Sequence, residues 1–228
     1  RSPSRGLGDV YKRQLGNGMC CAEKYIFFGC WVKDPDKSGR EQQNYLIRVK
    51  YGKLTDNLTN GINISVPEAT GAIAFYKKSH LIIKVKSRNG YLTFMMGKIL
   101  INEKGTAGRF DTLWTFYVKN TTGFSRGQDI YYDAQTDCLF IPQCNNANNV
   151  NKIMVVNLSG ESETYKGNKL YTPQDIITVD KQKDYSKYEI ESLVIAPKRH
   201  IVMEANIVPK GTKTCLLYTS PSPRDGLL

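Results

Sequence analysis

Short apolar segments separated by polar turns run through the whole chain. They are rich in tyrosine, isoleucine, valine, phenylalanine and threonine, with glycine, asparagine, aspartate and lysine between them. In several of them, among them residues 45–51, 113–118 and 152–158, apolar side chains recur at every second position. This period of two is typical of β-strands, and no window of about eleven or more residues carries the apolar stripe of an amphipathic helix. The pattern predicts an all-β chain.

A hairpin pattern recurs along the chain, each time with an apolar strand, a polar turn and a second apolar strand. Its copies are residues 18–31, 71–85, 127–143 and 190–206. The equivalent anchor positions Ile73, Ile130 and Leu193 lie about 60 residues apart, which suits a four-stranded propeller blade with long loops. The repeat therefore points to an array of similar β-units.

Two further strand candidates follow each of the first three hairpins. They are residues 45–51 and 61–66, then 91–101 and 110–118, then 151–158 and 171–179. Four strands per repeat is the number that a propeller blade requires. We therefore predict a partial β-propeller of about three four-stranded blades plus part of a fourth. An open sandwich or a solenoid of similar hairpins is the alternative.

The two ends of the chain carry a signal of a different kind. The string CLLYTSPSPRD at residues 215–225 can be back-translated into one strand of the mosaic-end adapter of transposon-based sequencing libraries. Residues 4–14, SRGLGDVYKRQ, match the reverse complement of that strand. Segments of this kind are excluded from reasoning about a fold. We expect residues 1–14 and 215–228 to be adapter artefacts and residues 15–214 to form the partial propeller domain, as a fragment of a longer protein.

The chain is basic, with 32 lysines and arginines against 21 aspartates and glutamates. Leaving out the two ends removes five basic and two acidic residues, which leaves 27 and 19. A basic surface favours an anionic partner. The lysines are scattered and accompany no nucleic-acid-binding module, so we expect no specific binding of nucleic acid. The longest apolar run, residues 25–31, is far shorter than the ~20 residues of a membrane helix, so no transmembrane span is predicted.

Cysteine spacing argues against a disulfide framework or a zinc site. Outside the two ends the chain has Cys20, Cys21, Cys30, Cys138 and Cys144, an odd number without a Cys-x-x-Cys pair. They lie on or beside apolar strands, where cysteine packs as a small hydrophobic side chain. We expect them to be buried, with Cys138 and Cys144 near Cys30.

Histidines and acidic loops give little support for catalysis. His80 and His200 occupy equivalent turn positions just before the second strand of two hairpins, so we predict no histidine-based catalytic set. Residues 34–39, DPDKSG, imitate the start of a calcium-binding loop, but Tyr45 stands where that loop requires a bidentate glutamate. We interpret this segment as a surface loop.

Two short motifs carry a resemblance to a known group of propellers. Residues 128–132 place the polar pair Gln128 and Asp129 before an apolar-x-Tyr pattern, and residues 189–192 read Glu-x-Glu followed by serine. These motifs resemble inner strands of extracytoplasmic bacterial β-propellers of the wall-teichoic-acid-type and phage receptor-binding kinds. In that group a histidine often precedes the polar pair, where this chain has Arg126 and Gly127. The resemblance implies a surface-exposed binding protein.

The predicted propeller places polar residues at the start of its inner strands, at the mouth of a central channel. The candidate ligand-binding residues are Arg126, Gln128, Asp129, Glu189 and Glu191. In lactonase and glutamine-cyclotransferase kinds of propeller, such groups hold calcium or zinc, or act as acid and base. The alternative is that these residues bond neighbouring blades or face channel water.

We therefore expect a non-catalytic binding or scaffold propeller, extracytoplasmic and at the bacterial cell surface. Its expected partner is an anionic cell-envelope polymer, a carbohydrate or a protein, and no cofactor is predicted. A metal-dependent propeller hydrolase or transferase, lactonase-like or glutamine-cyclotransferase-like, is the alternative, with calcium as a metal to test. A third class, a protein-interaction platform inside the cell, is favoured by unpaired cysteines.

Overall fold

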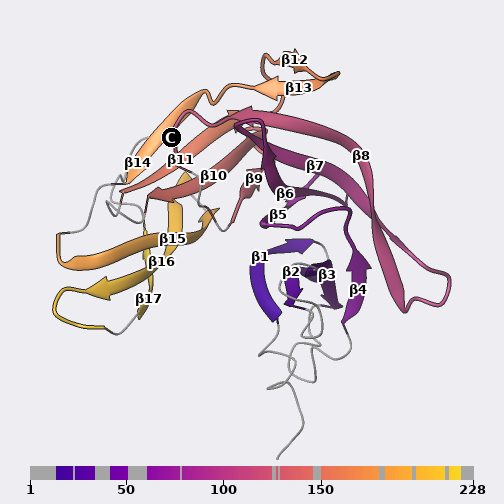
Figure 1. Ribbon diagram of the computed structural model, residues 1–228, viewed down its shortest axis with the longest axis horizontal. Helices are drawn as coiled ribbons and strands as arrows, with labels where there is room; N and C mark the ends of the chain where they lie inside the picture. Colours follow the sequence, from indigo (N-terminus) through magenta and orange to yellow (C-terminus); the bar gives the residue numbers. More distant parts are fainter. Residues whose placement is uncertain are drawn as a thin grey trace, which may run out of the picture. The chain divides into compact units, whose positions relative to one another are not determined.

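The chain folds into β-strands and turns. A computed structural model describes residues 14–22, 24–33, 42–50, 61–77, 79–124, 127, 129–145, 150–179, 183–196, 199–213 and 216–221. Its strands are β1 (Gln14–Ala22), β2 (Tyr25–Lys33), β3 (Gln42–Lys50), β4 (Ile62–Ser65), β5 (Ala72–Tyr76), β6 (His80–Arg88), β7 (Tyr91–Ile101), β8 (Ala107–Lys119), β9 (Tyr131–Asp133), β10 (Cys138–Asn145), β11 (Val150–Asn157), β12 (Glu163–Tyr165), β13 (Asn168–Tyr171), β14 (Asp175–Val179), β15 (Tyr185–Ile195), β16 (Ile201–Pro209) and β17 (Leu216–Pro221) (Figure 1). The predicted all-β class is confirmed. No helix in the described ranges is long and apolar enough to cross a membrane.

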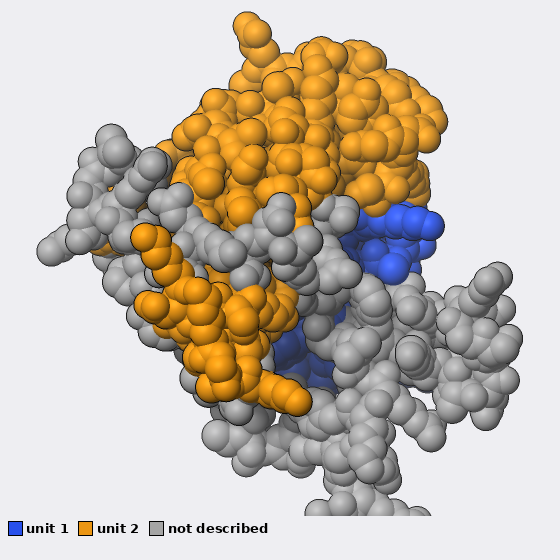
Figure 2. All heavy atoms as spheres, turned by 60° about the vertical axis from the view of Figure 1, so that its left-hand side comes forward, with its two compact units in different colours: residues 1–86, 95–114 blue, residues 87–94, 115–228 orange. Residues whose placement is uncertain are grey.

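The chain divides into two compact units (Figure 2). Unit 1 consists of residues 1–86 and 95–114, and unit 2 of residues 87–94 and 115–228. Strands β6, β7 and β8 contribute residues to both. Each unit has a hydrophobic cluster of its own and is described separately below.

Unit 1 is a nearly closed, barrel-like sheet. The strand order is β1-β2-β3-β4-β8-β7-β6-β5, antiparallel from β1 to β4, with β4 parallel to β8. The two outermost strands, β1 and β5, contact each other. The cluster inside this sheet consists of Phe27, Leu46, Ile64, Ile73, Leu81, Ile83, Val85, Met95 and Phe110. Seven of the eight strands contribute to it, so the closing of the sheet and the formation of the core depend on each other.

A glycine permits the contact between β1 and β5. Gly18 has a φ of +73°, and a Cβ built on it would lie 2.9 Å from both the Ala72 Cα and the Ile73 backbone nitrogen. The β1–β2 register shifts between Gly16 and Met19, so Gly18 lies in an irregularity of β1. Such bulges are a usual means of bending a strand where a sheet closes.

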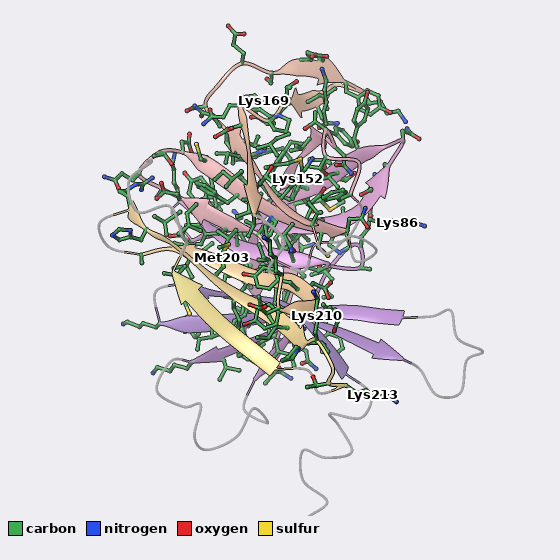
Figure 3. The ribbon with its side chains drawn as sticks, turned by 90° about the vertical axis from the view of Figure 1, so that its left-hand side faces the viewer. Lys86, Lys152, Lys169, Met203, Lys210 and Lys213 are labelled. Carbon is green, nitrogen blue, oxygen red and sulfur yellow. The ribbon has the colours of Figure 1, made fainter. Side chains whose placement is uncertain are left out.

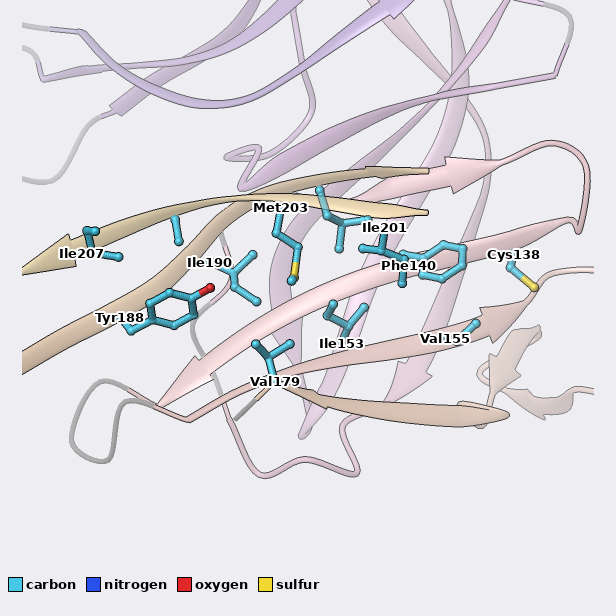
Figure 4. Packing of buried hydrophobic residues seen from close by; sticks show 12 residues of the cluster. Cys138, Phe140, Ile153, Val155, Val179, Tyr188, Ile190, Ile201, Met203 and Ile207 are labelled. Carbon is cyan, nitrogen blue, oxygen red and sulfur yellow. The ribbon is translucent and has the colours of Figure 1, made fainter. Parts of the chain in front are cut away.

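Unit 2 contains two sheets that pack face to face. One has the order β14-β11-β10-β9 and the other β15-β16-β17, both antiparallel. Figure 4 shows Phe140 and Ile153 of the first sheet facing Ile190 and Met203 of the second. Strand β16 alternates buried and half-buried residues from Ile201 onward, as expected where one face meets a core.

Most of the predicted strands are confirmed. All four predicted hairpins form, as β1–β2, β5–β6, β9–β10 and β15–β16. The predicted strand at 171–179 is confirmed only in its second half, because β13 ends at Tyr171 and β14 begins at Asp175. Pro173 lies in the gap, and proline has no N–H to donate to a strand ladder. The prediction also missed the β12–β13 hairpin, whose turn is made by Lys166 and Gly167, both with positive φ.

The cysteine prediction holds in part. Cys138 and Cys144 are buried as predicted, Cys20 is half-buried and Cys21 is exposed. Cys21 pairs with Ile26 between β1 and β2. Its side chain is nevertheless exposed, so apolar neighbours in the sequence did not ensure that this face of the strand is covered. The side chain of Cys30 and the loop 34–39 lie outside the described residues, and so do Arg126 and Gln128.

Candidate functional site

The acidic residues proposed from the sequence as ligand-binding candidates all lie in unit 2. Asp129 is buried just before β9, whereas Glu189 and Glu191 lie on β15. In the described part of the chain, no three histidine, cysteine, aspartate or glutamate side chains are grouped so that they could hold a metal ion. Asp129, Glu189 and Glu191 therefore do not form a ligand triad.

A β-bulge at Glu191 sets the polar face of the β15–β16 hairpin. Ile190 pairs with Ala205 and Ser192 pairs with Glu204, so Glu191 is an extra residue in β15. Before the bulge, Glu189 lies opposite Asn206. Since side chains alternate along a strand, one extra residue moves all later side chains to the opposite face.

The glutamates of this hairpin are tied to neighbouring side chains. Lys187 Nζ lies 2.7 Å from Glu189 Oε2, and Cys144 Sγ donates to Glu189 Oε1 over 3.3 Å. Asn206 Nδ2 donates to Glu191 Oε1. On the next pair, Ser192 Oγ donates to Glu204 Oε2 over 3.0 Å. A polar network therefore runs along the hairpin.

Glu191 is a carboxyl of this network whose pKa is raised. Burial raises the pKa of its carboxyl above the ordinary value, and the charge of Glu189 raises it further. Asn206 and Lys187 oppose this rise, and Glu204 adds to it. A carboxyl of this kind can keep a proton to a higher pH than an exposed glutamate, which is a property of general acids.

Asn151, which the sequence prediction did not single out, holds β15 beside the glutamates. Its side chain is fully buried on β11. Nδ2 donates to the Tyr188 carbonyl over 2.9 Å, and Oδ1 accepts from the Ile190 N–H over 3.0 Å. One amide thus satisfies two backbone groups of an edge strand, as a neighbouring strand would do. The sign of this role in the sequence was an asparagine among the mostly apolar residues 150–156.

A second polar contact joins the β9–β10 turn to the β15–β16 turn. Arg199 Nη1 lies 2.8 Å from Asp133 Oδ2 and donates to Gln135 Oε1 over 3.0 Å. Thr136 Oγ1 also donates to Asp133 Oδ2, over 2.5 Å. Burial alone would raise the pKa of Asp133, but the bonds from Thr136, Arg199 and Gln135 outweigh it, so this pKa lies below its ordinary value.

We expect Asp133→Asn to destabilise unit 2 at neutral pH by about 2 kcal/mol, because hydrogen bonds to an ionised partner are lost. Folding lowers the pKa of Asp133. Its contribution is therefore present above the unfolded-state pKa of about 4 and is lost as the pH falls through the lower folded-state pKa. Urea unfolding at pH 7 and near pH 2 measures the difference between variant and wild type, which should shrink in acid.

The exposed Asp184 provides the control for this prediction. Asp184→Asn should change the free energy of unfolding by less than about 0.5 kcal/mol at either pH. A difference between Asp133→Asn and wild type that stays constant from neutral to acid pH would contradict the assignment of this stability to the ionised carboxylate.

The fold is all-β and propeller-like. No protein-family model matches the chain, and no curated protein matches its sequence. Among solved structures, an engineered GH43 glycoside hydrolase with endo-xylanase and exo-arabinofuranosidase activity is 9% identical, with a TM-score of 0.54 over 96% of this chain and 39% of that one.

Two further solved structures are less similar. A GH32 β-fructofuranosidase of Bombyx mori in complex with sucrose is 11% identical, with a TM-score of 0.45 over 92% of this chain and 46% of that one. A periplasmic gluconolactonase of Pseudomonas aeruginosa is 7% identical, with a TM-score of 0.38 over 90% and 71%. The chain thus spans less than half of either glycoside hydrolase. At these identities the likeness concerns the fold alone.

Proposed function

We propose that this chain is part of a non-catalytic binding or scaffold β-propeller that works at the bacterial cell surface and binds an anionic polymer of the cell envelope. Three four-stranded blades plus part of a fourth are the proposed architecture. The propeller-like fold and the four-stranded antiparallel sheet β14-β11-β10-β9 support it. The extracytoplasmic location rests on the resemblance of residues 128–132 and 189–192 to surface propellers.

The distribution of exposed charge in unit 1 is the observation that carries the proposal. Among the residues of this unit whose exposure the structure describes, the exposed basic ones are Lys24, Lys50, Lys77, Lys86, Lys98, Lys104 and Arg109. Against these stands Glu103, which is the one fully exposed acidic side chain in the described part of this unit. Figure 3 shows the Lys86 side chain reaching away from the ribbon. An excess of one sign of charge attracts and concentrates a polymer of the other sign.

The described surface of unit 2 differs because its exposed charges are more evenly balanced, although some of its acidic side chains are buried. Asp129, Asp133 and Glu189 are buried, and Glu163 bonds to Lys119. Exposed acidic groups nevertheless remain on this unit, among them Glu161 and Asp184. Unit 1 is therefore the better surface for a polyanion.

The full chain is expected to bind immobilised inorganic polyphosphate and to leave a neutral dextran unbound. Affinity should fall at least about tenfold between 50 and 200 mM salt, because binding releases counterions. The triple variant Lys98→Gln, Lys104→Gln, Arg109→Gln should lose most of the binding. The matched triple in unit 2, Lys169→Gln, Lys183→Gln, Lys210→Gln, should retain it.

The basic residues at the N-terminal end of the sequence need their own control, because they too could bind a polyanion. The variant Arg5→Gln, Lys12→Gln, Arg13→Gln serves this purpose and should bind like the wild type. An affinity for polyphosphate that does not fall with salt, or an equal loss of affinity in the two matched triple variants, would rule out the proposed surface.

A metal-dependent propeller hydrolase or transferase is the second candidate. The raised pKa of Glu191 beside the charge of Glu189 is the observation that favours it, since catalytic acids need such a shift. Thermal unfolding with added calcium or zinc separates the two candidates. A melting temperature that rises with either metal in the wild type, and no longer rises in Glu191→Gln, would favour the hydrolase or transferase.

A further inference from the structure

Unit 2 contains a polar hollow between the turn that follows β11 and the strand β13. Its volume is about 370 Å³, and its lining residues are Asn157, Gly160, Glu161, Ser162, Glu163, Leu170, Thr172 and Gln174. This volume lies within the range of small-molecule sites. Leu170 is the buried apolar residue of the lining, and hydroxyl, amide and carboxylate groups make up most of the rest.

Backbone and side-chain bonds fix the walls of the hollow. The Leu158 N–H donates to the Asp137 carbonyl over 2.9 Å, and Tyr171 Oη donates to the Leu158 carbonyl over 3.0 Å. On the opposite wall, the Gln174 N–H donates to the Val155 carbonyl over 2.9 Å. A site whose walls are already held in place loses little free energy to ordering when a ligand binds.

The lining offers both donors and acceptors to a ligand. Asn157 Oδ1 accepts from the backbone N–H and the hydroxyl of Ser159, at 2.9 and 2.8 Å. Its Nδ2 has no acceptor among the residues that the structure describes, and the same holds for the hydroxyls of Ser162 and Thr172. Donors and acceptors around one space suit a ligand with several hydroxyl groups.

The charge of the lining adds a second requirement. Lys119 Nζ bonds to Glu163 Oε1, so that carboxylate has a counter-ion. Within the described residues Glu161 has none. The hollow therefore carries one uncompensated negative charge, which disfavours an anionic ligand and favours a ligand with a single positive charge.

We propose that this hollow binds an amine-bearing polyol, of which an amino sugar is the simplest form. The ammonium group lies against Glu161, and the hydroxyls bond to Asn157, Ser162, Thr172 and Gln174. The C–H face of the ring packs on Leu170. This site lies in unit 2 and is independent of the polyanion surface proposed for unit 1, so either proposal can fail without the other.

D-Glucosamine and D-glucose are the matched probes, since they differ in the amine at one ring position. At a pH where the amine is protonated, protein-observed NMR titration of the full chain should show shifts at residues 157–174 with both sugars at millimolar concentration. Glucosamine should bind about two- to fivefold more tightly, the ratio that one exposed ion pair supplies.

Three variants complete the test. Glu161→Gln should abolish the preference for glucosamine and leave glucose binding unchanged, whereas Asp184→Asn, an exposed charge outside the hollow, should preserve the preference. Ser162→Phe should fill the hollow and remove binding of both sugars, with an unchanged circular dichroism spectrum. Equal binding of the two sugars to the wild type, absence of binding, or a preference that survives Glu161→Gln would overturn the proposal.

Discussion

Replacing Gly97 with alanine is expected to unfold unit 1 or to destabilise it by more than about 3 kcal/mol. Gly97 is buried on β7. A Cβ at this position would lie 2.3 Å from the Asp111 carbonyl oxygen and 2.8 Å from two ring atoms of Phe110. The carbonyl belongs to the backbone of β8, and Phe110 is part of the hydrophobic cluster of unit 1, so neither can give way cheaply. Urea unfolding and hydrogen exchange of the β5–β8 amides measure the loss.

Gly71 provides the matched control for this substitution. It lies next to β5, and its Cβ would have only the Lys84 carbonyl oxygen nearby, at 3.7 Å, which is an ordinary contact. Gly71→Ala should change the free energy of unfolding by less than about 1 kcal/mol. If the two alanine variants are equally stable, β7 and β8 do not approach each other as closely as described at Gly97.

Strands were predictable from the sequence wherever an apolar run is bounded by polar turns. The stretch 91–101 was predicted with the same bounds as β7, and the four hairpins were located from their turns. The predictions that failed depend on single residues. Pro173 interrupts the strand that was predicted to run from 171 to 179, and Gly167 makes a turn inside a polar segment, where no hairpin was predicted. The β4–β8 pairing could not be predicted, because nothing local encodes which distant strand becomes a parallel neighbour.

The bulge at Glu191 left a trace in the sequence that the prediction did not use. Tyr188 and Ile190 belong to the hydrophobic cluster of unit 2, and so does Leu193. An unbroken alternation from Tyr188 and Ile190 would put Leu193 on the polar face. The extra residue restores it to the core, so a change of phase in the apolar pattern was the readable sign. The burial of Glu189 and the raised pKa of Glu191 depend on surrounding strands and could not be predicted in this way.

Asn151→Ala is expected to destabilise unit 2 by about 2–5 kcal/mol. The alanine leaves the Tyr188 carbonyl and the Ile190 N–H without the partner that Asn151 gives them, in a buried place where water does not substitute. Asn151→Asp sharpens the test. Its carboxylate still accepts from Ile190 but faces the Tyr188 carbonyl without a donor, so this variant should gain stability as the pH falls and the carboxyl becomes protonated.

The control is Asn168→Ala, which removes a single bond from Asn168 Nδ2 to the Lys166 carbonyl at an exposed turn. It should cost less than about 1 kcal/mol, measured by urea unfolding beside the Asn151 variants. Hydrogen exchange at Ile190 provides a local readout and should accelerate in Asn151→Ala well before global unfolding. If Asn151→Ala costs no more than Asn168→Ala, the amide does not hold the edge of β15, and the bulge that places Glu191 must be fixed by the packing of Ile190 and Leu193 alone.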